Sequence, residues 1–183
     1  MTRTRYIAQA GVIAAVYAAA TILVMQFLNL LAIGPIQLRV SEALTVVAFF
    51  TPAAVPGLAV GSVVANLYSF ALLGSPLALL DVVFGSLGTL IGAAWTWRFR
   101  GNMALGLAGP VVSNSLIVAA YLPWLVKGLG LYEVPLLGVN LEGRWLPMYL
   151  FGVVTIAIGQ AVVMYGLGLP LLIALKRLRP IEA

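Results

Sequence analysis

Four polar side chains lie inside long apolar stretches of this chain, and their types suit binding. They are Asn66, Asp81, Asn114 and Gln160. A carboxylate in hydrocarbon is costly unless it is paired, protonated or facing water, and such residues usually mark functional sites. Since no basic residue lies near Asp81 in its own segment, we expect Asp81 to serve a site. The amides have a plainer alternative, hydrogen bonding between helices, and for Gln160 we expect that structural role.

A polar island at residues 34–44 separates the first two apolar stretches. Its polar members are Gln37, Arg39, Ser41 and Glu42. An acid and a base in so apolar a chain indicate contact with water, a partner or a ligand. We therefore expect a loop and a helix start at one membrane face, above a small-molecule site. Ser41 before Glu42 is also an ordinary helix N-cap with an acid at the positive end of the helix dipole, so this pair has a structural alternative.

The composition places these residues in a membrane. Of the 183 residues, 63% are hydrophobic and 8% are charged, whereas soluble domains carry about 25% charged residues. We therefore predict an all-α integral membrane protein with one transmembrane domain over residues 1–183. The chain has no Cys and no His. This excludes disulfides and thiolate metal sites and removes the commonest metal ligand, so we expect neither a metal nor a cofactor.

Six apolar segments are long enough, or nearly so, to cross a bilayer, and they leave only short loops. We predict spans over residues 7–32, 41–50, 54–73, 75–97, 103–125 and 147–175. The second is short for a full crossing, so it has to tilt or rely on the protein interior. A longer polar loop at 126–146 joins the last two spans.

Basic residues decide the orientation, because cytoplasmic loops carry the excess of Lys and Arg. With both termini inside, seven basic residues face the cytoplasm: Arg3, Arg5, Arg98, Arg100, Lys176, Arg177 and Arg179. Three lie outside: Arg39, Lys127 and Arg144. We therefore expect a multi-pass protein of the cell membrane, with both termini cytoplasmic and the polar island outside.

Helical rise gives the depth of each polar side chain below the outer surface. Asp81 lies about 9 Å down, Asn66 about 10 Å and Asn114 about 16 Å, while Gln160 is near or past the midplane. With Glu42 at the rim, this predicts an outward-facing cup about one ligand deep. A pore would need polar residues along its whole length, and here they stop halfway.

Several classes of protein are excluded or disfavoured. The chain lacks a G-x-x-x-x-G-K-[ST] phosphate loop, so we expect that it does not hydrolyse ATP itself. It shows no inverted repeat of discontinuous helices, which disfavours a self-sufficient secondary transporter. A binding cup with no motif for ATP hydrolysis and no continuous polar path across the membrane indicates a binding subunit of a larger complex rather than an enzyme. The alternatives are a membrane-embedded enzyme that needs only Asp81 and water, and a purely structural subunit.

Small residues recur every four positions in the first span, at Ala10, Ala14 and Ala18, with Gly11 and other small residues beside them. Such spacing lets another helix approach closely. That helix could belong to the protein's own bundle or, because the row lies in the cytoplasmic half, to a partner.

Ordered blocks of sequence carry a family resemblance. They are residues 34–44, Pro56-Gly57-Leu58 followed by Asn66-Leu67, residues 81–90, and Gly168-Leu169-Pro170. Together they resemble the QueT family, proposed queuosine-precursor S components of energy-coupling-factor (ECF) transporters. The resemblance implies a six-helix S component that captures a 7-deazaguanine, first of all 7-aminomethyl-7-deazaguanine, for ATP-driven uptake. It implies a transmembrane T component and two ABC-type ATPases as partners, with the row of Ala10, Ala14 and Ala18 docking the T component. The chain departs from the family at Gln160, where Glu is expected.

Such a ligand gives the polar residues specific contacts. A guanine-like face presents adjacent N–H donors, which a carboxylate accepts in pairs, and an aminomethyl cation needs a second acid. Glu42 and Asp81 are the carboxylates placed for these contacts, and an amide of Asn66 or Asn114 can serve the O6 atom and a ring N–H. The candidates to stack on the ring, or to act instead as interfacial anchors, are Tyr68, Tyr121, Trp124 and Trp145. The substrate contacts expected are Glu42, Asn66, Asp81, Asn114, Arg39 and Tyr68. An S component for another vitamin is the alternative within transport.

Overall fold

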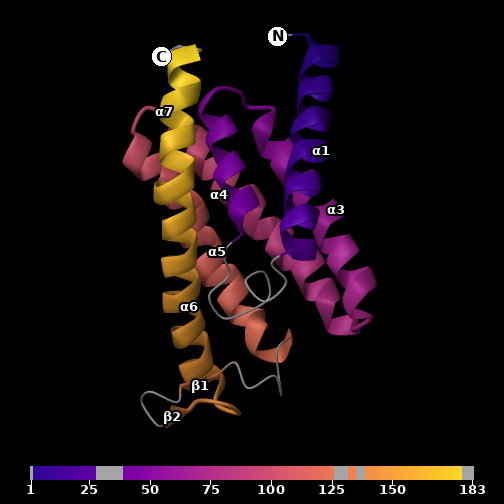
Figure 1. Ribbon diagram of the computed structural model, residues 1–183, viewed down its shortest axis with the longest axis vertical. Helices are drawn as coiled ribbons and strands as arrows, with labels where there is room; N and C mark the ends of the chain where they lie inside the picture. The colour runs from indigo at the N-terminus through magenta and orange to yellow at the C-terminus, as the bar shows by residue number, and fades with distance from the viewer. Residues whose placement is uncertain (1, 28–38, 126–131, 135–138, 179–183) are drawn as a thin grey trace.

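A bundle of membrane-length helices forms the protein, as the composition predicts (Figure 1). The computed structural model describes residues 2–27, 39–125, 132–134 and 139–178. Its α-helices are α1 (Arg3–Phe27), α3 (Ala54–Leu73), α4 (Ser86–Arg98), α5 (Met103–Leu125), α6 (Trp145–Ala161) and α7 (Leu169–Leu178). Two segments are 3-10 helices, η1 (Val40–Phe49) and η2 (Pro76–Ala78), and two are π-helical, η3 (Asp81–Gly85) and η5 (Val162–Gly168).

Five helical stretches in the described residues are long and apolar enough to cross a membrane. They are Arg3–Gln26, Ala54–Leu72, Pro76–Arg98, Met103–Leu125 and Trp145–Leu178. The predicted second span is the short helix η1, which is a buried element of the bundle rather than a membrane-length helix. The last stretch runs continuously through α6, η5 and α7, and its 34 residues extend about 50 Å.

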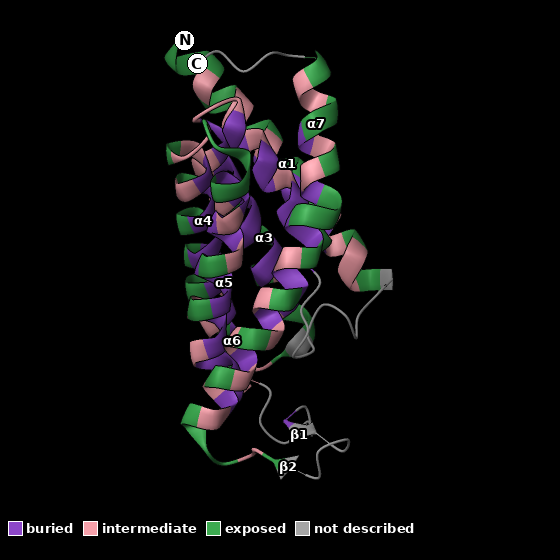
Figure 2. Ribbon diagram, turned by 90° about the vertical axis from the view of Figure 1, so that its left-hand side faces the viewer, coloured by how far each residue is buried: buried purple, intermediate pink, exposed green. Residues whose placement is uncertain are grey.

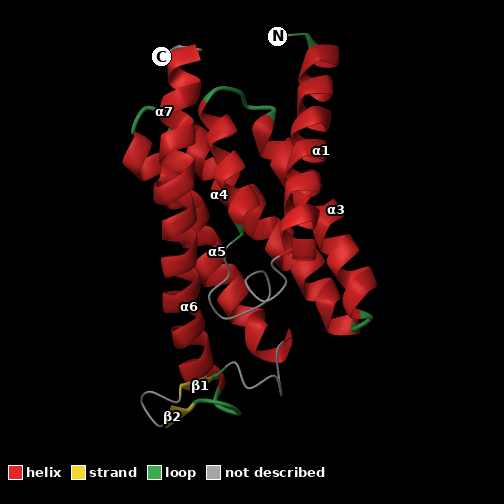
Figure 3. Ribbon diagram, in the orientation of Figure 1, coloured by secondary structure: helices red, strands yellow, loops and turns green. Residues whose placement is uncertain are grey.

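The ends of the bundle are sharply different. The start of α1, the end of α7 and the turns at residues 50–53 and 99–102 lie together at one end (Figures 1 and 3). Two antiparallel strands, β1 (Glu133–Val134) and β2 (Val139–Asn140), lie at the opposite end in the connection between α5 and α6. Basic residues at the terminal end include Arg3, Arg98 and Lys176. Both termini therefore lie on one face, as the charge pattern predicts.

Close approach of α1 and α3 uses the small residues of the first span. A Cβ on Gly57 would lie 2.8 Å from the carbonyl oxygen of Ala10, and one on Gly61 would lie 2.7 Å from that of Ala14. Ala14 and Ala18 are buried accordingly. α3 packs against Ala10 and Ala14, which favours the alternative stated for this row, a contact inside the protein's own bundle.

Burial follows the membrane pattern, with polar groups inside and apolar side chains outside. Figure 2 shows buried residues gathered where the helices face one another and exposed ones on the outer surfaces. Large apolar side chains such as Val60, Val64 and Leu150 are about half exposed on those outer surfaces, with relative exposures of 54%, 47% and 54%. Lipid tails are as apolar as these side chains, so such a surface suits the interior of a bilayer.

Candidate functional site

Irregular helix geometry positions the polar side chains of the interior. Arg39 immediately precedes the 3-10 helix η1, and Glu42 lies in its first turn. Asp81 begins the π-helical turn η3, which continues directly into α4. Long 3-10 runs and π-turns are uncommon and frequently occur at functional sites. Both carboxylates of the predicted site therefore stand on backbone that departs from the regular α-helix.

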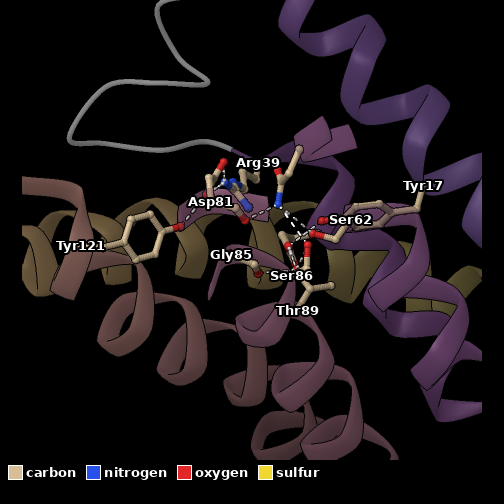
Figure 4. A network of polar contacts seen from close by, with 10 residues as sticks. Tyr17, Arg39, Ser62, Asp81, Gly85, Ser86, Thr89 and Tyr121 are labelled. Carbon is tan, nitrogen blue, oxygen red and sulfur yellow. Dashed lines mark hydrogen bonds and ion pairs between the residues drawn. The ribbon is translucent and has the colours of Figure 1, made fainter. Parts of the chain in front are cut away.

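Asp81 is the centre of one polar cluster (Figure 4). One terminal guanidinium nitrogen of Arg39 donates to its Oδ1 at 2.9 Å and its Oδ2 at 3.0 Å. The hydroxyl of Tyr121, from α5, donates to Oδ1 at 2.5 Å. The amide of Asn66, from α3, donates to the backbone oxygen of Asp81 at 2.8 Å. Arg39 and Asp81 are both buried, so the ion pair neutralises the carboxylate that the sequence showed without a local partner.

Glu42 is the centre of a second cluster, and its side chain is fully buried. Its Oε1 accepts hydrogen bonds from the hydroxyls of Tyr17 at 2.7 Å and Thr89 at 3.0 Å. The hydroxyl of Thr45 donates to Oε2 at 3.4 Å. All three donors are neutral, and the salt bridge found in the described residues joins Arg39 to Asp81 instead. Glu42 is therefore a buried carboxylate held by hydroxyl groups.

Serine and threonine hydroxyls connect the two clusters. Asn66 also donates to Ser62 at 3.4 Å and to Ser86 at 3.2 Å, and Thr89 lies 3.3 Å from the Ser62 hydroxyl. Because Thr89 bonds Glu42 as well, one continuous network runs from Asp81 to Glu42 through α3 and α4 (Figure 4). We use the name polar chamber for this set of hydrogen-bonded residues, without reference to a cavity.

Gly85, the last residue of η3, allows Tyr121 to approach Asp81 closely. A Cβ on Gly85 would lie 2.5 Å from Oδ1 of Asp81 and 3.1 Å from the hydroxyl of Tyr121. Any side chain there would separate the two partners, so the short contact between α5 and η3 requires glycine.

Two further amides are buried without hydrogen-bond partners in the described part of the chain. Asn114 and Gln160 are each 1% exposed, and both polar atoms of each side chain are unpaired there. A Cβ on Gly88, one residue before Thr89, would lie 2.6 Å from Oδ1 of Asn114, so this amide packs directly against α4.

A comparison with known protein families identifies the family to which this chain belongs. A family model described as QueT transporter matches residues 7–177. The chain belongs to the QueT transporter family. No curated protein and no solved structure matches it significantly. The resemblance stated from the sequence blocks is thereby confirmed, and this QueT family member is a membrane protein with a transport role.

Most of the residues expected at the site of this QueT protein meet in the chamber. Arg39, Glu42, Asn66 and Asp81 all take part in its hydrogen bonds. Tyr68 does not, since its hydroxyl accepts a hydrogen bond from Gln26 on the α1 side of α3. Trp124 and Trp145 are about half exposed and stack on each other with ring centroids 6.5 Å apart. They lie at the end of the bundle, as interfacial anchors do.

Two local expectations were wrong. Ser41 is not an N-cap, because η1 begins at Val40 and the Ser41 hydroxyl accepts a hydrogen bond from Thr21 at 2.7 Å. Glu42 is not at an exposed rim, because η1 carries it inward to Tyr17 and Thr89. The rest of the predicted polar island, residues 34–38, lies outside the described residues.

Sequence reasoning missed the hydroxyl donors of this QueT chamber. Tyr17 stands in an apolar span where a tyrosine has no distinctive pattern. The other donors did carry a signal, because Ser62 and Asn66 are four residues apart, and Ser86 and Thr89 are three apart. Such spacings place polar side chains on one helix face.

Proposed function

We propose that this protein is the substrate-binding S component of an ECF transporter and captures a 7-deazaguanine, first of all 7-aminomethyl-7-deazaguanine. Membership in the QueT transporter family supports transport. The observation that carries the proposal is Glu42, a fully buried carboxylate whose hydrogen bonds come from neutral hydroxyls. Charged side chains are rarely kept inside a membrane protein without functional use.

The charge of the chamber favours a cationic ligand. Among the described residues of the chamber, Arg39 contributes one positive charge, and Asp81 and Glu42 contribute one negative charge each. The Arg39–Asp81 pair is neutral, so the formal sum is one negative charge on Glu42. An aminomethyl cation supplies the missing positive charge, and a charge-assisted hydrogen bond to the carboxylate is about twice as strong as a neutral one.

Neutral polar groups around Glu42 suit the rest of the ligand. A deazaguanine presents adjacent N–H donors and a carbonyl acceptor, which hydroxyls and amides can serve. Tyr121 places an aromatic ring beside Phe84, with ring centroids 6.0 Å apart. Aromatic faces of this kind are typical walls for a flat heterocycle.

We propose that partner subunits bind at the end of the bundle that holds the start of α1 and the end of α7. A groove of about 650 Å³ lies between the first turns of α1, the end of η1 and the end of α7. Its lining is mostly apolar: Arg5, Ala8, Gln9, Val12, Ile13, Val47, Phe50, Thr51, Leu175 and Leu178. We propose that a helix of a T component docks here on the cytoplasmic side, and that two ABC-type ATPases energise the complex.

Calorimetry on the purified protein tests the substrate proposal. Titration with 7-aminomethyl-7-deazaguanine, its neutral 7-cyano analogue, guanine and a panel of vitamins should show the tightest binding for the aminomethyl compound. Tightest binding of a vitamin would show that the substrate is a vitamin and would leave the proposed S-component role in place. Absence of binding across the whole panel, with the fold intact, would refute a capture function.

Docking is tested separately from capture. Ala8→Trp fills the groove and should stop uptake in cells that contain the T component and ATPases, while the purified variant binds substrate normally. Ala19→Trp is the matched control, since Ala19 is exposed on the same helix but does not line the groove. Equal uptake by both variants would show that the docking surface lies elsewhere on the protein.

A further inference from the structure

The buried amides of the bundle differ in how many hydrogen bonds they make. The two N–H groups of the Asn66 amide have three acceptors in range, the backbone oxygen of Asp81 and the hydroxyls of Ser62 and Ser86, so this side chain is held by the protein. Gln160 is equally buried, yet both its Nε2 and its Oε1 have no partner among the described residues. A buried amide without partners is unfavourable, because it loses its hydrogen bonds to water and gains none in return. Such a group in a folded protein needs an explanation.

The packing of α6 against α5 gives the level of Gln160. Ile156, one turn before it, belongs to a core cluster with Val118 of α5. Met164, one turn after it, belongs to a cluster with Leu107 of α5. The two helices run antiparallel, so Gln160 lies alongside the part of α5 halfway between these residues. Asn114 lies on α5 within about one helical turn of that level.

Two unpaired amides therefore lie within about one helical turn of each other along the bundle. Asn114 also packs on Gly88, beside the Thr89 that bonds Glu42. Each primary amide offers both a donor and an acceptor, which complements a ring edge that carries both N–H and C=O groups. A cation alone would use only their oxygens, whereas a guanine edge, with N1–H and N2–H donors beside the O6 acceptor, can pair with both the oxygens and the nitrogens.

We propose that Gln160, together with Asn114, binds the neutral hydrogen-bonding edge of the substrate ring, while Glu42 binds its cationic group. This inference rests on the proposed capture function and revises the structural role expected for Gln160. It divides the site into a charged half on η1 and an amide half on α5 and α6. The Arg39–Asp81 pair is neutral as a unit and takes no part in this division.

Stability and affinity together test the role of Gln160. Gln160→Met keeps the length of the side chain and removes both polar atoms. Because the wild-type amide is unpaired without ligand, the melting temperature of the ligand-free variant should be unchanged or higher. Its affinity for 7-aminomethyl-7-deazaguanine should fall about tenfold. Gln9→Met is the matched control, since Gln9 lies on α1 outside the chamber and accepts a hydrogen bond from Thr51; this variant should bind normally.

The outcomes separate this inference from the function on which it rests. If the wild type binds deazaguanines and Gln160→Met binds equally well, the inference is wrong and the proposed function stands. If the wild type binds none of them, the substrate proposal fails first. The melting temperature of the ligand-free protein is informative in either case. A clear fall for both Gln160→Met and Gln160→Leu would show a structural hydrogen bond and overturn the inference.

Discussion

Arg39 and Asp81 are 42 residues apart in the sequence, yet one guanidinium nitrogen bonds both carboxylate oxygens, at 2.9 and 3.0 Å. The pair joins the beginning of η1 to the beginning of η3. Tyr121 of α5 donates to the same carboxylate, so three separate elements converge on Asp81. A buried pair of this kind is balanced only while both partners are present.

Removing one partner of this ion pair should destabilise the protein more than replacing both partners together. Arg39→Met and Asp81→Asn each leave one buried charge unpaired, which should cost about 3–5 kcal/mol of unfolding free energy. The double variant removes both charges and should lose less than the sum of the two single variants. Denaturation of all four proteins in one detergent measures this coupling. Additive losses would show that the two side chains do not interact energetically.

Charge on Glu42 should decide between cationic and neutral ligands. Glu42→Gln keeps the volume and the hydroxyl contacts but removes the charge. We expect it to weaken binding of 7-aminomethyl-7-deazaguanine about tenfold to a hundredfold, with little effect on the neutral 7-cyano analogue. Glu142→Gln makes the same change in the loop before α6 and serves as the control. An equal loss for both ligands would place Glu42 at the ring rather than at the cation.

Glycine 61 should be required for the contact between α1 and α3. A Cβ at Gly61 would lie 2.7 Å from the backbone of Ala14, whereas one at Gly11 would meet no atom within 4 Å. Both are helical, so alanine gains about 1 kcal/mol of helix propensity at either site. Gly61→Ala should nevertheless lower the melting temperature, and Gly11→Ala should leave it unchanged or raise it. Similar effects of the two substitutions would contradict the close approach.

Single cysteines can test the orientation in the membrane, because the chain contains none of its own. Thr4→Cys and Gly101→Cys lie at the end of the bundle that holds both termini, and Gly138→Cys lies in the connection between α5 and α6. In intact cells, an impermeant thiol reagent should label only Gly138→Cys. Labelling of Thr4→Cys without permeabilisation would reverse the proposed topology.

Tyrosine 132 should make stability depend on alkaline pH. Burial raises the pKa of Tyr132 from 10.0 to about 12. Since the folded pKa lies above the unfolded one, this contribution is complete below about pH 10 and is lost as the pH rises towards 12. The hydroxyl has no hydrogen-bond partner among the described residues, so Tyr132→Phe should cost little at pH 7. Unfolding followed from pH 7 to 12 should show a smaller alkaline loss in the variant, and parallel curves would exclude this role.

Local signals made much of the fold predictable. The bounds of α3 and α5 agree with the predicted spans, because prolines, glycine and charged residues mark their ends. The first span was predicted to reach residue 32, and α1 is described to Phe27. The π-helical turns were not predictable, since a turn with one extra residue leaves the apolar pattern almost unchanged. Asp81 was nonetheless identified, because a carboxylate in an apolar span has few harmless explanations.

Partners of the site residues were harder to predict than the residues themselves. Arg39 was recognised as part of a polar island, but its pairing with Asp81 depends on a contact across 42 positions. Hydropathy also cannot distinguish a paired amide from an unpaired one. Asn66 and Gln160 therefore looked alike in the sequence, although the first is bonded three times and the second has no partner in the described ranges.

In the proposed S component, the hydrogen bond from Tyr17 to Glu42 would link the ligand site to the docking groove. Tyr17 belongs to α1, the same helix whose first turns line the apolar groove. A ligand that took over Oε1 of Glu42 would compete with the tyrosine hydroxyl and would weaken the contact between α1 and η1. Thermodynamic linkage is reciprocal, so a protein docked on α1 would alter ligand affinity by the same factor. The empty and loaded forms would then differ in their attraction for the docked protein, and one hydroxyl group would report occupancy from one side of the membrane to the other.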